Sequence, residues 1–583
     1  MKTPRACLYC ALPCGTGANT IPGKYLFVGS GLKAKLKRQS RSVLDETGKK
    51  DPEQRARRQF VNFRRMVSCL GTSWVIFLMT APAQAFSILG EEWEKFFKER
   101  VTFAGFIENT TGLSIAAGDS KFTTGNRFIM NRFVIQPEFN FDFDERVKLF
   151  ISWRFVKEPR YNKETKDRRR NSPSLQPLDN TFYDEDSFKP WEMVWDVHPI
   201  DRLSLRIGRQ FISWGETDGL RLLDVINPQD GTFSPPAAAN LFSLDETRIP
   251  LWGLRASYRL VPASNTALEF IAMPGYDGRK KRVDESAPTA GRWAPHPETR
   301  MPLGRLFANP IGAAPVVIPS ISRVWPDAGD NWRLGGRVIH SIGKLNFGLG
   351  YIWGFNPQPG DLTFKLLGTS LGPGGTTIAR LRLFNDRTSI FAGHFNYPLE
   401  ELKTALKGEI ALYPSKPFNI SKYPGSPGLK AGPDPRHPDG ITEKNTLRYS
   451  LGFDRSTLIP FLHPDDPWRV FNLSFQIFQS IIFDHEDGIR AFSTAEKIKQ
   501  VSTSLTFRVS TGYFGDTVLP DVFVGYDPEG YWLANPAISY VPPWNEKMRL
   551  SLIAALYGGR NKFKSFGSFD EKDSIFLKMR YQF

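Results

Sequence analysis

Apolar and polar side chains alternate with a period of two along much of the chain. In the last ten residues, SIFLKMRYQF, the apolar and aromatic side chains fall on one face of an extended strand, while Lys578, Arg580 and Gln582 fall on the other. The same alternation recurs at 147–155 and 203–208. Because successive side chains of a β-strand point to opposite faces, this period predicts strands.

About 18 such segments follow one another, each long enough to cross a bilayer as a tilted strand. Short turns on the periplasmic side and longer loops outside are typical of outer-membrane barrels, whereas a soluble β-sandwich gives no reason for that asymmetry. The pattern therefore predicts an all-β fold: a transmembrane antiparallel up-and-down β-barrel of about 18 strands, or 16, at 102–583 in the cell outer membrane. The tight links lie near 142–145, 198–201, 261–264, 341–344 and 513–516, and the long polar stretches at 157–189, 214–249, 275–331, 356–386 and 414–444.

The end of the chain fits the same prediction. Lipid offers no partner to backbone N–H and C=O groups, so the sheet must close on itself, and an even strand count returns the chain to its starting side. Tyr581 and Phe583 on the last strand resemble the signal that the barrel assembly machinery of the outer membrane reads. We therefore expect that machinery as a partner, besides outer-membrane lipid and lipopolysaccharide.

A stretch before the first strand has the features of an export signal. Two arginines precede an apolar core at 67–80, and a small-x-small cleavage site ends at Ala85. We predict a secretory signal peptide at 61–85; a buried helix of a soluble domain is the alternative. Residues 1–60 are basic and lack apolar periodicity, which predicts a disordered leader or an N-terminal extension from an over-long gene start.

Net charge and cysteine content add little to this picture. The formal net charge is +16, but residues 1–85 hold 15 Lys and Arg against 4 Asp and Glu, so +5 (16 less 11) remains beyond them. A basic surface for nucleic acid is therefore not expected. A metal site is not predicted either, because the Cys-x2-Cys-x3-Cys spacing lacks a nearby fourth ligand. All the cysteines lie in the same N-terminal segment: Cys7, Cys10, Cys14 and Cys69.

The segment 86–101 is predicted to be a short N-terminal helix or periplasmic segment. Trp93, Phe96, Phe97 and Val101 fall on one helical stripe. Such a helix would plug the lumen, lie in the periplasm or pack under the barrel rim.

Aromatic side chains are expected at both membrane boundaries, where one end of the ring meets lipid and the other meets water. We interpret the Trp and Tyr residues near predicted strand ends as such anchors rather than as ligand stackers. They are Trp153, Trp191, Trp195, Trp214, Tyr351, Trp353, Tyr526, Tyr531, Trp532, Tyr540, Trp544 and Tyr557.

The most distinctive run is GRQFISWGETDGLRLLDVINPQD at 208–230. Together with the export signal and the terminal Phe583, its G-R-Q…W-G-E…D-V-x-N-P-Q-D string resembles a widespread family of Gram-negative outer-membrane barrels described as a domain of unknown function. The resemblance covers most of 100–583. It implies a porin-like barrel that works beside an inner-membrane efflux-type transporter and a periplasmic lipid-carrier-like protein, and that moves hydrophobic compounds such as lipids or steroids.

Without the resemblance, this run predicts a strand that reaches the outer rim and enters a loop rich in carboxylates and turn-forming residues. If the loop folds into the barrel as a constriction, its carboxylates oppose basic and polar groups on the wall and set selectivity. Alternatively, these residues pin the loop to the wall through hydrogen bonds and caps. Calcium is a third alternative, but the spacing matches no known calcium loop. The candidate pore or constriction-loop residues are Arg206, Gln210, Trp214, Glu216, Asp218, Asp224, Asn227 and Asp230.

Two other loops have unusual composition. The apolar stretch 301–319 is expected to fold over or into the lumen, or to pack against a neighbouring loop, because exposure would be unfavourable. The charged stretch 161–170 either contacts lipopolysaccharide phosphates through its Lys and Arg or is simply solvated.

The seven histidines of the sequence have no catalytic context, and H-E-x-x-H and phosphate-loop motifs are absent. We therefore predict no catalytic residues and no cofactor. The expected function is a porin-like channel or transport component for small molecules, hydrophobic lipid- or steroid-like ones included. The alternatives are a lipase- or protease-like barrel enzyme and a structural or adhesive barrel without transport.

Overall fold

The computed structural model describes most of the chain after residue 90. The predicted leader and signal peptide, all the cysteines, the stretch 161–170 and most of the 275–331 loop lie outside the described residues, so the predictions made for them stay predictions. The described residues are 91–116, 128–158, 190–217, 220–229, 235, 237–241, 244–275, 316–317, 321–324, 332–355, 363–371, 377–384, 387–420, 436–437, 439–491, 496–562 and 564–583.

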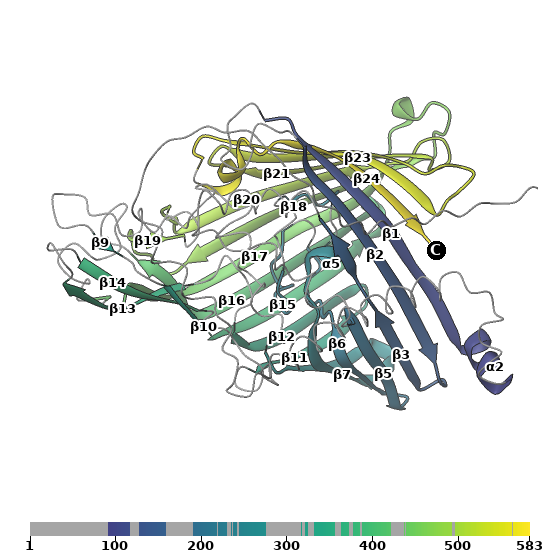
Figure 1. Cartoon of the computed structure of the whole chain (residues 1–583), viewed down its shortest axis with the longest axis horizontal. Coiled ribbons are helices and arrows are strands. Elements are labelled where there is room, and N and C mark those ends of the chain that lie inside the picture. Colours follow the sequence, from purple (N-terminus) through teal and green to yellow (C-terminus); the bar gives the residue numbers. More distant parts are fainter. Residues whose placement is uncertain are drawn as a thin grey trace, which may run out of the picture. The chain divides into compact units, whose positions relative to one another are not determined.

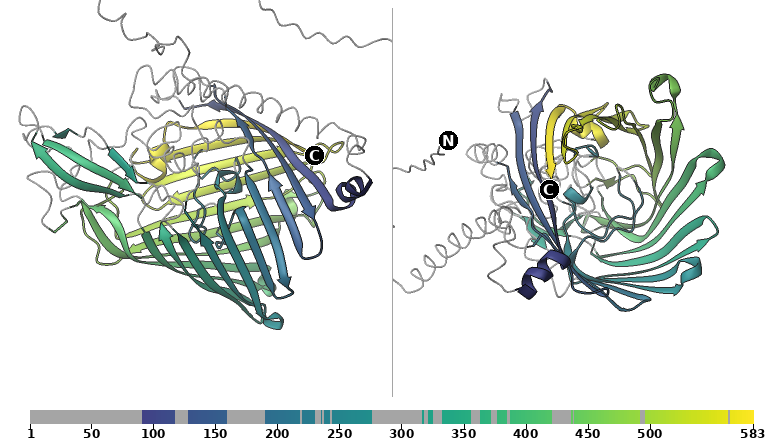
Figure 2. Two further views of the ribbon diagram at one scale, coloured as in Figure 1. Left: turned by 60° about the horizontal axis from the view of Figure 1, so that its bottom comes forward. Right: turned by 90° about the vertical axis from the view of Figure 1, so that its right-hand side faces the viewer.

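The alternating segments form one closed antiparallel barrel (Figures 1 and 2). Each strand pairs with the next along the chain, and β24 pairs back onto β1, which confirms the predicted closure. With β3 and β4 counted as one interrupted strand, the barrel has 18 strands. These are β1 (Val101–Ser114), β2 (Phe128–Asp142), β3 (Val147–Ser152), β4 (Phe155–Lys157), β5 (Glu192–Ile200), β6 (Leu203–Gln210), β7 (Leu251–Val261), β8 (Thr266–Met273), β11 (Arg333–Ile342), β12 (Leu345–Phe355), β15 (Arg387–Leu399), β16 (Thr404–Ile420), β17 (Ile441–Leu458), β18 (Val470–Ile482), β20 (Val501–Ser510), β21 (Val518–Asp527), β22 (Tyr531–Tyr540), β23 (Met548–Gly559) and β24 (Ser574–Gln582).

The seam between the first and last strands is tight. The backbone N–H of Phe583 donates to the carbonyl of Gly105 at 3.1 Å, and its ring stacks on Phe103 with centroids 5.2 Å apart. Gly105 has a φ of +155°, and a Cβ at this position would lie 2.3 Å from the carbonyl oxygen of Gln136. The seam therefore needs glycine on β1 and brings the terminal phenylalanine into the barrel wall.

The two faces of the wall differ as the alternation predicts. Outward-facing apolar side chains such as Ile107, Ile207 and Leu349 are 44%, 45% and 62% exposed in the isolated chain. Inward positions carry polar or charged groups, among them Glu108 and Gln476, which are buried inside the barrel. An apolar exterior on a sheet without free edges is the arrangement that satisfies the backbone in lipid. The chain is thus an outer-membrane type of β-barrel, as predicted.

Short connections gather at one end of the barrel, called here the short-turn end. The 3-10 turns η3 (Pro262–Ser264) and η7 (Glu400–Leu402) close two of its hairpins, and η8 (Pro460–Leu462) lies in a third. The helix α2 (Glu91–Arg100) lies at this end, where Phe96 contacts Phe143 of the β2–β3 turn with ring centroids 5.7 Å apart. It packs at the rim, one of the three predicted alternatives. In the part of the chain that the structure describes, no helix is long and apolar enough to cross a membrane.

The long connections contain more structure than predicted. Part of the polar stretch 356–386 forms the hairpin β13 (Thr363–Leu371) and β14 (Thr377–Phe384). With β9 (Val316–Val317) and β10 (Ile321–Val324) it makes a separate four-stranded sheet. Elsewhere the short strand β19 (Ile489–Arg490) pairs with the extended end of β16, and η9 (Ser565–Phe569) lies between β23 and β24.

The aromatic residues interpreted as membrane anchors fall into two groups. Trp195, Tyr526 and Trp532 are 37–42% exposed, as an anchor requires. Trp191, Trp214, Tyr531 and Tyr557 are instead at most 5% exposed, so the interpretation as lipid-facing anchors is wrong for them. Their position near strand ends was correct, but loop segments cover them.

Candidate constriction in the barrel lumen

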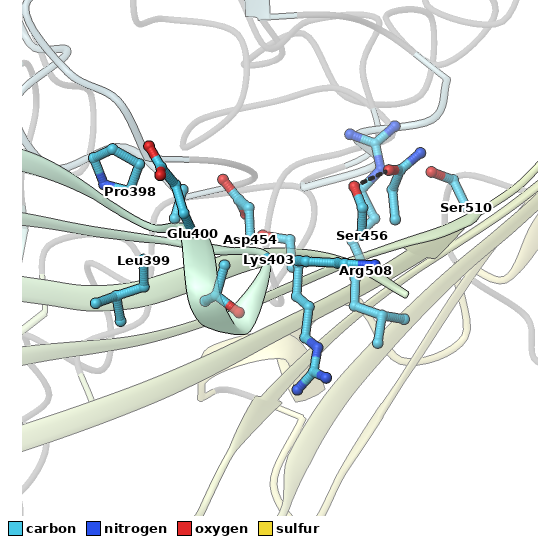
Figure 3. Close-up of a pocket in the computed structure, with 14 residues that line it drawn as sticks. Pro398, Leu399, Glu400, Lys403, Asp454, Ser456, Arg508 and Ser510 are labelled. Carbon is cyan, nitrogen blue, oxygen red and sulfur yellow. Dashed lines mark hydrogen bonds between the residues drawn. The ribbon is translucent and has the colours of Figure 1, made fainter. Parts of the chain in front are cut away.

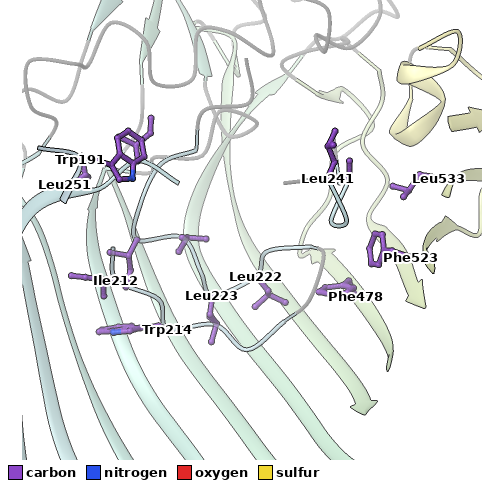
Figure 4. Close-up of a cluster of buried hydrophobic side chains, with 14 of the residues drawn as sticks. Trp191, Ile212, Trp214, Leu222, Leu223, Leu241, Leu251, Phe478, Phe523 and Leu533 are labelled. Carbon is purple, nitrogen blue, oxygen red and sulfur yellow. The ribbon is translucent and has the colours of Figure 1, made fainter. Parts of the chain in front are cut away.

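The connection between β6 and β7, residues 211–250, is called here the inner loop, and its described parts, 211–217, 220–229, 235, 237–241 and 244–250, fold into the barrel. It includes the short helix α5 (Leu244–Thr247). Its apolar side chains share one buried cluster with inward-facing side chains of the wall (Figure 4). The loop contributes Ile212, Trp214, Leu222, Leu223, Val225, Ile226, Ala238, Leu241 and Ile249, and the wall contributes residues including Ile271, Ile352, Ile390, Phe478, Phe523 and Leu533.

Asn227 joins the two ends of the inner loop. Its side-chain oxygen accepts the N–H of Ile212 at 2.8 Å, and its side-chain nitrogen donates to the carbonyls of Gln210 at 3.1 Å and Ile249 at 3.0 Å. The N–H of Ile249 donates to the carbonyl of Pro228 at 2.8 Å. The Asn-Pro pair of the motif therefore closes the base of the loop where it leaves β6 and returns to β7.

Carboxylates of the wall hold the near part of the loop. Glu409 on β16 accepts three loop N–H groups, from Glu216 and Thr217 on Oε1 and from Leu223 on Oε2, the latter two at 2.8 and 2.9 Å. Glu269 on β8 accepts the indole N–H of Trp214. Because these acceptors are charged and buried, each bond is stronger than one between neutral groups.

The far part of the loop reaches strands near the end of the chain. Asn240 donates its backbone N–H to the side chain of Asn535 on β22 at 2.8 Å. Lys578 on β24 donates to the carbonyl of Leu241 at 2.7 Å and lies 3.2 Å from Glu246. The loop thus spans the lumen from β6 and β7 to β22 and β24.

The structure places most of the predicted site residues at these contacts. Trp214 stacks under the guanidinium of Arg337, 5.0 Å from the ring centroid. Glu216 extends toward β15, where the ring nitrogen Nδ1 of His394 lies 3.1 Å from its Oε1. Asp218 and Asp230 lie outside the described residues.

Of the loop carboxylates predicted to oppose Arg206, the structure describes Glu216 and Asp224, and neither is paired with it. Arg206 faces Asp196 on the adjacent strand at 3.8 Å. Asp224 is neutralised within the loop by Arg221, 3.3 Å away, and by Arg248. The wall carboxylates accept hydrogen bonds from N–H groups of the loop backbone. The arginines that neutralise the loop carboxylate Asp224 belong to the loop itself. The contacts are those that the alternative, pinning of the loop, predicts.

Sequence reasoning missed the partners on the wall. Glu269, Glu409 and Lys578 are inward-facing charges on strands, and alternation marks them as inward. Nothing local distinguishes them from other inward polar residues. Among the residues described, no group of three or more His, Cys, Asp and Glu side chains is placed to hold a metal ion.

Three cavities line the described wall toward the short-turn end. One of about 530 Å³ lies against β15–β20 and is lined by Asp454, Ser456 and Arg508 among others (Figure 3). A second, of about 360 Å³, lies against β5–β7 and contains four arginines. A third, of about 540 Å³, is lined by Phe106, Phe150, Trp191 and Phe211 together with charged groups.

Comparisons with known proteins concern the family and the fold. The family model with the description "Protein of unknown function (DUF1302)" matches residues 66–583. No curated protein matches the sequence.

Several solved structures of bacterial proteins are similar in fold. OpdL of Pseudomonas aeruginosa has 9% sequence identity, with 83% of this chain and 98% of that chain covered and a TM-score of 0.40. OccK2 (OpdF) of the same organism, in complex with glucuronate, has 9% identity, 84% and 98% coverage and a TM-score of 0.41. Acinetobacter baumannii OccAB4 has 8% identity, 83% and 98% coverage and a TM-score of 0.42. The barrel itself is established by the strand pairing of this chain.

Proposed function

The chain belongs to the DUF1302 family of proteins of unknown function, and we propose that this outer-membrane barrel is a channel or transport component for small molecules, hydrophobic ones of lipid or steroid type included. The observation that carries the proposal is the inner loop. A barrel of 16 to 18 strands encloses an aqueous lumen unless loops fill it. Here a folded loop crosses that lumen and is hydrogen-bonded to the wall at Glu409 and at Lys578.

The lining supports solutes with an apolar part. The inner loop and inward-facing apolar side chains of the wall together form a buried apolar cluster. Beside it, the cavity of about 540 Å³ combines five aromatic rings with charged groups that include Arg154, Glu246 and Arg580. Binding sites for small molecules are commonly of this size.

We also propose the partners that the family resemblance implies, an inner-membrane transporter and a periplasmic carrier. The support is the orientation expected for such barrels, in which the short-turn end faces the periplasm. The cavities described above lie toward that end, where a carrier would deliver or collect solute.

Reconstitution tests the proposal. The purified barrel is placed in planar bilayers and in liposomes, and ion conductance, liposome swelling and uptake of a fluorescent steroid are measured. Ion conductance together with steroid uptake supports the full proposal, and conductance alone supports a channel for polar solutes. A folded barrel that passes neither contradicts it and favours a structural role, whereas cleavage of phospholipid or peptide would favour an enzyme.

A further inference from the structure

The cavity on β5–β7 differs from the other two in its charge. It is lined by Asp196, His198, Asp201, Arg202, Ser204, Arg206, Arg255, Ser257 and Arg259. With histidine neutral, four guanidinium groups face two carboxylates. We propose that this arginine-lined cavity is an anion-binding subsite at the short-turn end of the channel, which takes the carboxylate or phosphate group of a permeating solute. The inference rests on the proposed transport function and names a substrate chemistry for it.

The strand register brings the arginines together on the inner wall. Arg206 of β6 lies directly opposite Arg255 of β7, and Asp196 of β5 lies opposite Arg206 on the other side. One step nearer the rim, Ser204 is opposite Ser257. Because side chains two residues apart on a strand share a face, these groups line the lumen in two rows.

Neighbouring carboxylates neutralise the cluster only in part. Asp196 forms an ion pair with Arg206 at 3.8 Å, a distance too long for a hydrogen bond. The Nε donor of Arg206 is shielded from water and makes no hydrogen bond within the described part of the chain. Arg255 is paired with Glu269, but that carboxylate also pairs with Arg337 at 3.1 Å. Two arginines thus share one acid.

The position of the cavity connects it with the constriction. Above the Arg206–Arg255 row, the next inward pair is Gly208 and Gly253, which carry no side chains. The pair after that is Gln210 and Leu251, where the inner loop begins and ends. A solute group in the cavity therefore lies directly below the base of the inner loop. The glycine pair between the cavity and the loop places no side chain there.

The cavity on β15–β20 provides an internal comparison. Its lining carries Lys403, Arg455 and Arg508 against Glu400 and Asp454, a smaller excess of positive charge. Arg508 donates two hydrogen bonds from Nε to Asp521 at 3.1 Å, and just beside the cavity Lys407 lies 2.8 Å from Asp454. The Ser456 hydroxyl donates to the side chain of Asn472 at 3.1 Å within the same cavity (Figure 3). The excess of arginine over carboxylate is thus larger in the β5–β7 cavity.

The chemistry of the lining favours an oxyanion. Guanidinium groups bind planar carboxylates and phosphates with paired hydrogen bonds, and the two serines can donate further bonds. Clefts lined by one sign of charge concentrate counter-ions. A volume of about 360 Å³ has room for an oxyanion together with a small organic part.

Charge selectivity measured in planar bilayers tests the subsite. The double variant Arg206→Gln/Arg259→Gln removes two charges and leaves the Arg255–Glu269 pair intact. Two unit charges about 6 Å away, screened at 0.1 M salt, change a local anion concentration about three- to fourfold. Because the local cation concentration rises by the same factor, we expect the chloride-to-potassium permeability ratio, taken from reversal potentials, to fall by about the square of that factor, roughly tenfold. Lys403→Gln, which removes an exposed charge from the β15–β20 cavity, is the matched control and should leave the ratio near that of the wild type.

Two further readouts separate the possible outcomes. Benzoate and inorganic phosphate, added at the short-turn side, should reduce the potassium chloride current of the wild type more than that of the double variant. Block by benzoate alone assigns the site to carboxylates, and block by both assigns it to oxyanions in general. An unchanged permeability ratio in a conducting double variant, or equal effects of Lys403→Gln, overturns the subsite.

Failure of transport is distinguishable from failure of the subsite. If the wild type does not conduct, the proposed function fails, and fluorobenzoate binding to the detergent-solubilised barrel is measured by ¹⁹F NMR line broadening instead. Broadening that the double variant loses supports an anion site in a barrel that is not a channel. Equal broadening in both proteins contradicts the site.

Discussion

Replacement of Glu409 by glutamine is expected to loosen the inner loop from the wall. The carboxylate accepts three loop N–H groups, two on Oε1 and one, from Leu223, on Oε2. Glutamine keeps one acceptor oxygen and turns an NH₂ group toward at least one N–H that needs an acceptor. A hydrogen bond to a charged group contributes about 1.5–3 kcal/mol, so a total loss of roughly 2–4 kcal/mol follows.

That loss sets the size of the functional effect. Each 1.4 kcal/mol changes an equilibrium tenfold, so the detached state of the loop should become about 30- to 800-fold more populated. Single-channel recordings of Glu409→Gln should show added flicker and larger conductance substates. Glu443→Gln removes an exposed carboxylate of β17 and is the control. Traces of Glu409→Gln that match both the wild type and this control would refute the view that the carboxylate holds the loop.

Two further predictions concern assembly and pH. Gly105→Ala should impair closure of the seam because its Cβ would meet the Gln136 carbonyl at 2.3 Å, whereas Gly336→Ala, whose nearest contact would be 3.7 Å, should be tolerated; loss of the heat-modifiable band on gels in the first variant alone is the expected result. Hydrogen bonding to Lys444, and further to His437, lowers the pKa of Glu486 from 4.5 to about 2. Because the folded pKa is depressed, this contribution to stability is complete above pH 4.5 and is lost as the pH falls toward 2. The hydrogen-exchange protection factors at the start of β17, corrected for the intrinsic pH dependence of amide exchange, should therefore fall over that interval, and unchanged protection would contradict the role of the carboxylate.

The sequence predicted the barrel well because the period of two is a local property. Each strand shows its lipid-facing side without reference to its neighbours, and closure follows from the need to satisfy the backbone in lipid. The hairpin of β13 and β14 escaped prediction because LTFKLLGTSL lies inside a stretch that reads as a long loop. Sheets in loops need not face lipid, so the membrane argument gives no expectation for them.

The candidate site could be predicted only in part. The carboxylates and turn-forming residues of the 208–230 run indicated a loop that either folds into the barrel or is pinned to its wall, and Asn227-Pro228 indicated a turn. The groups that fasten it come from strands nearly 200 and more than 300 residues away, as with Glu409 and Lys578. Trp214 was misread as an anchor because its burial depends on the loop fold, not on its distance from a strand end.

The charges of the lumen divide into two sets with separate tasks. Glu409 accepts hydrogen bonds from loop N–H groups, and Asp224 is neutralised by two arginines of the loop. Neither carboxylate therefore contributes much to the electrostatic potential in the solvent-filled part of the lumen. Arg206 and Arg259, by contrast, border a cavity with unmatched positive charge. Holding the loop and selecting the ion should therefore be separable: Glu409→Gln should alter flicker with little change in permeability ratio, and the double arginine variant should do the reverse. If both variants changed both quantities together, the loop and the arginine-lined cavity would have to act as one coupled element.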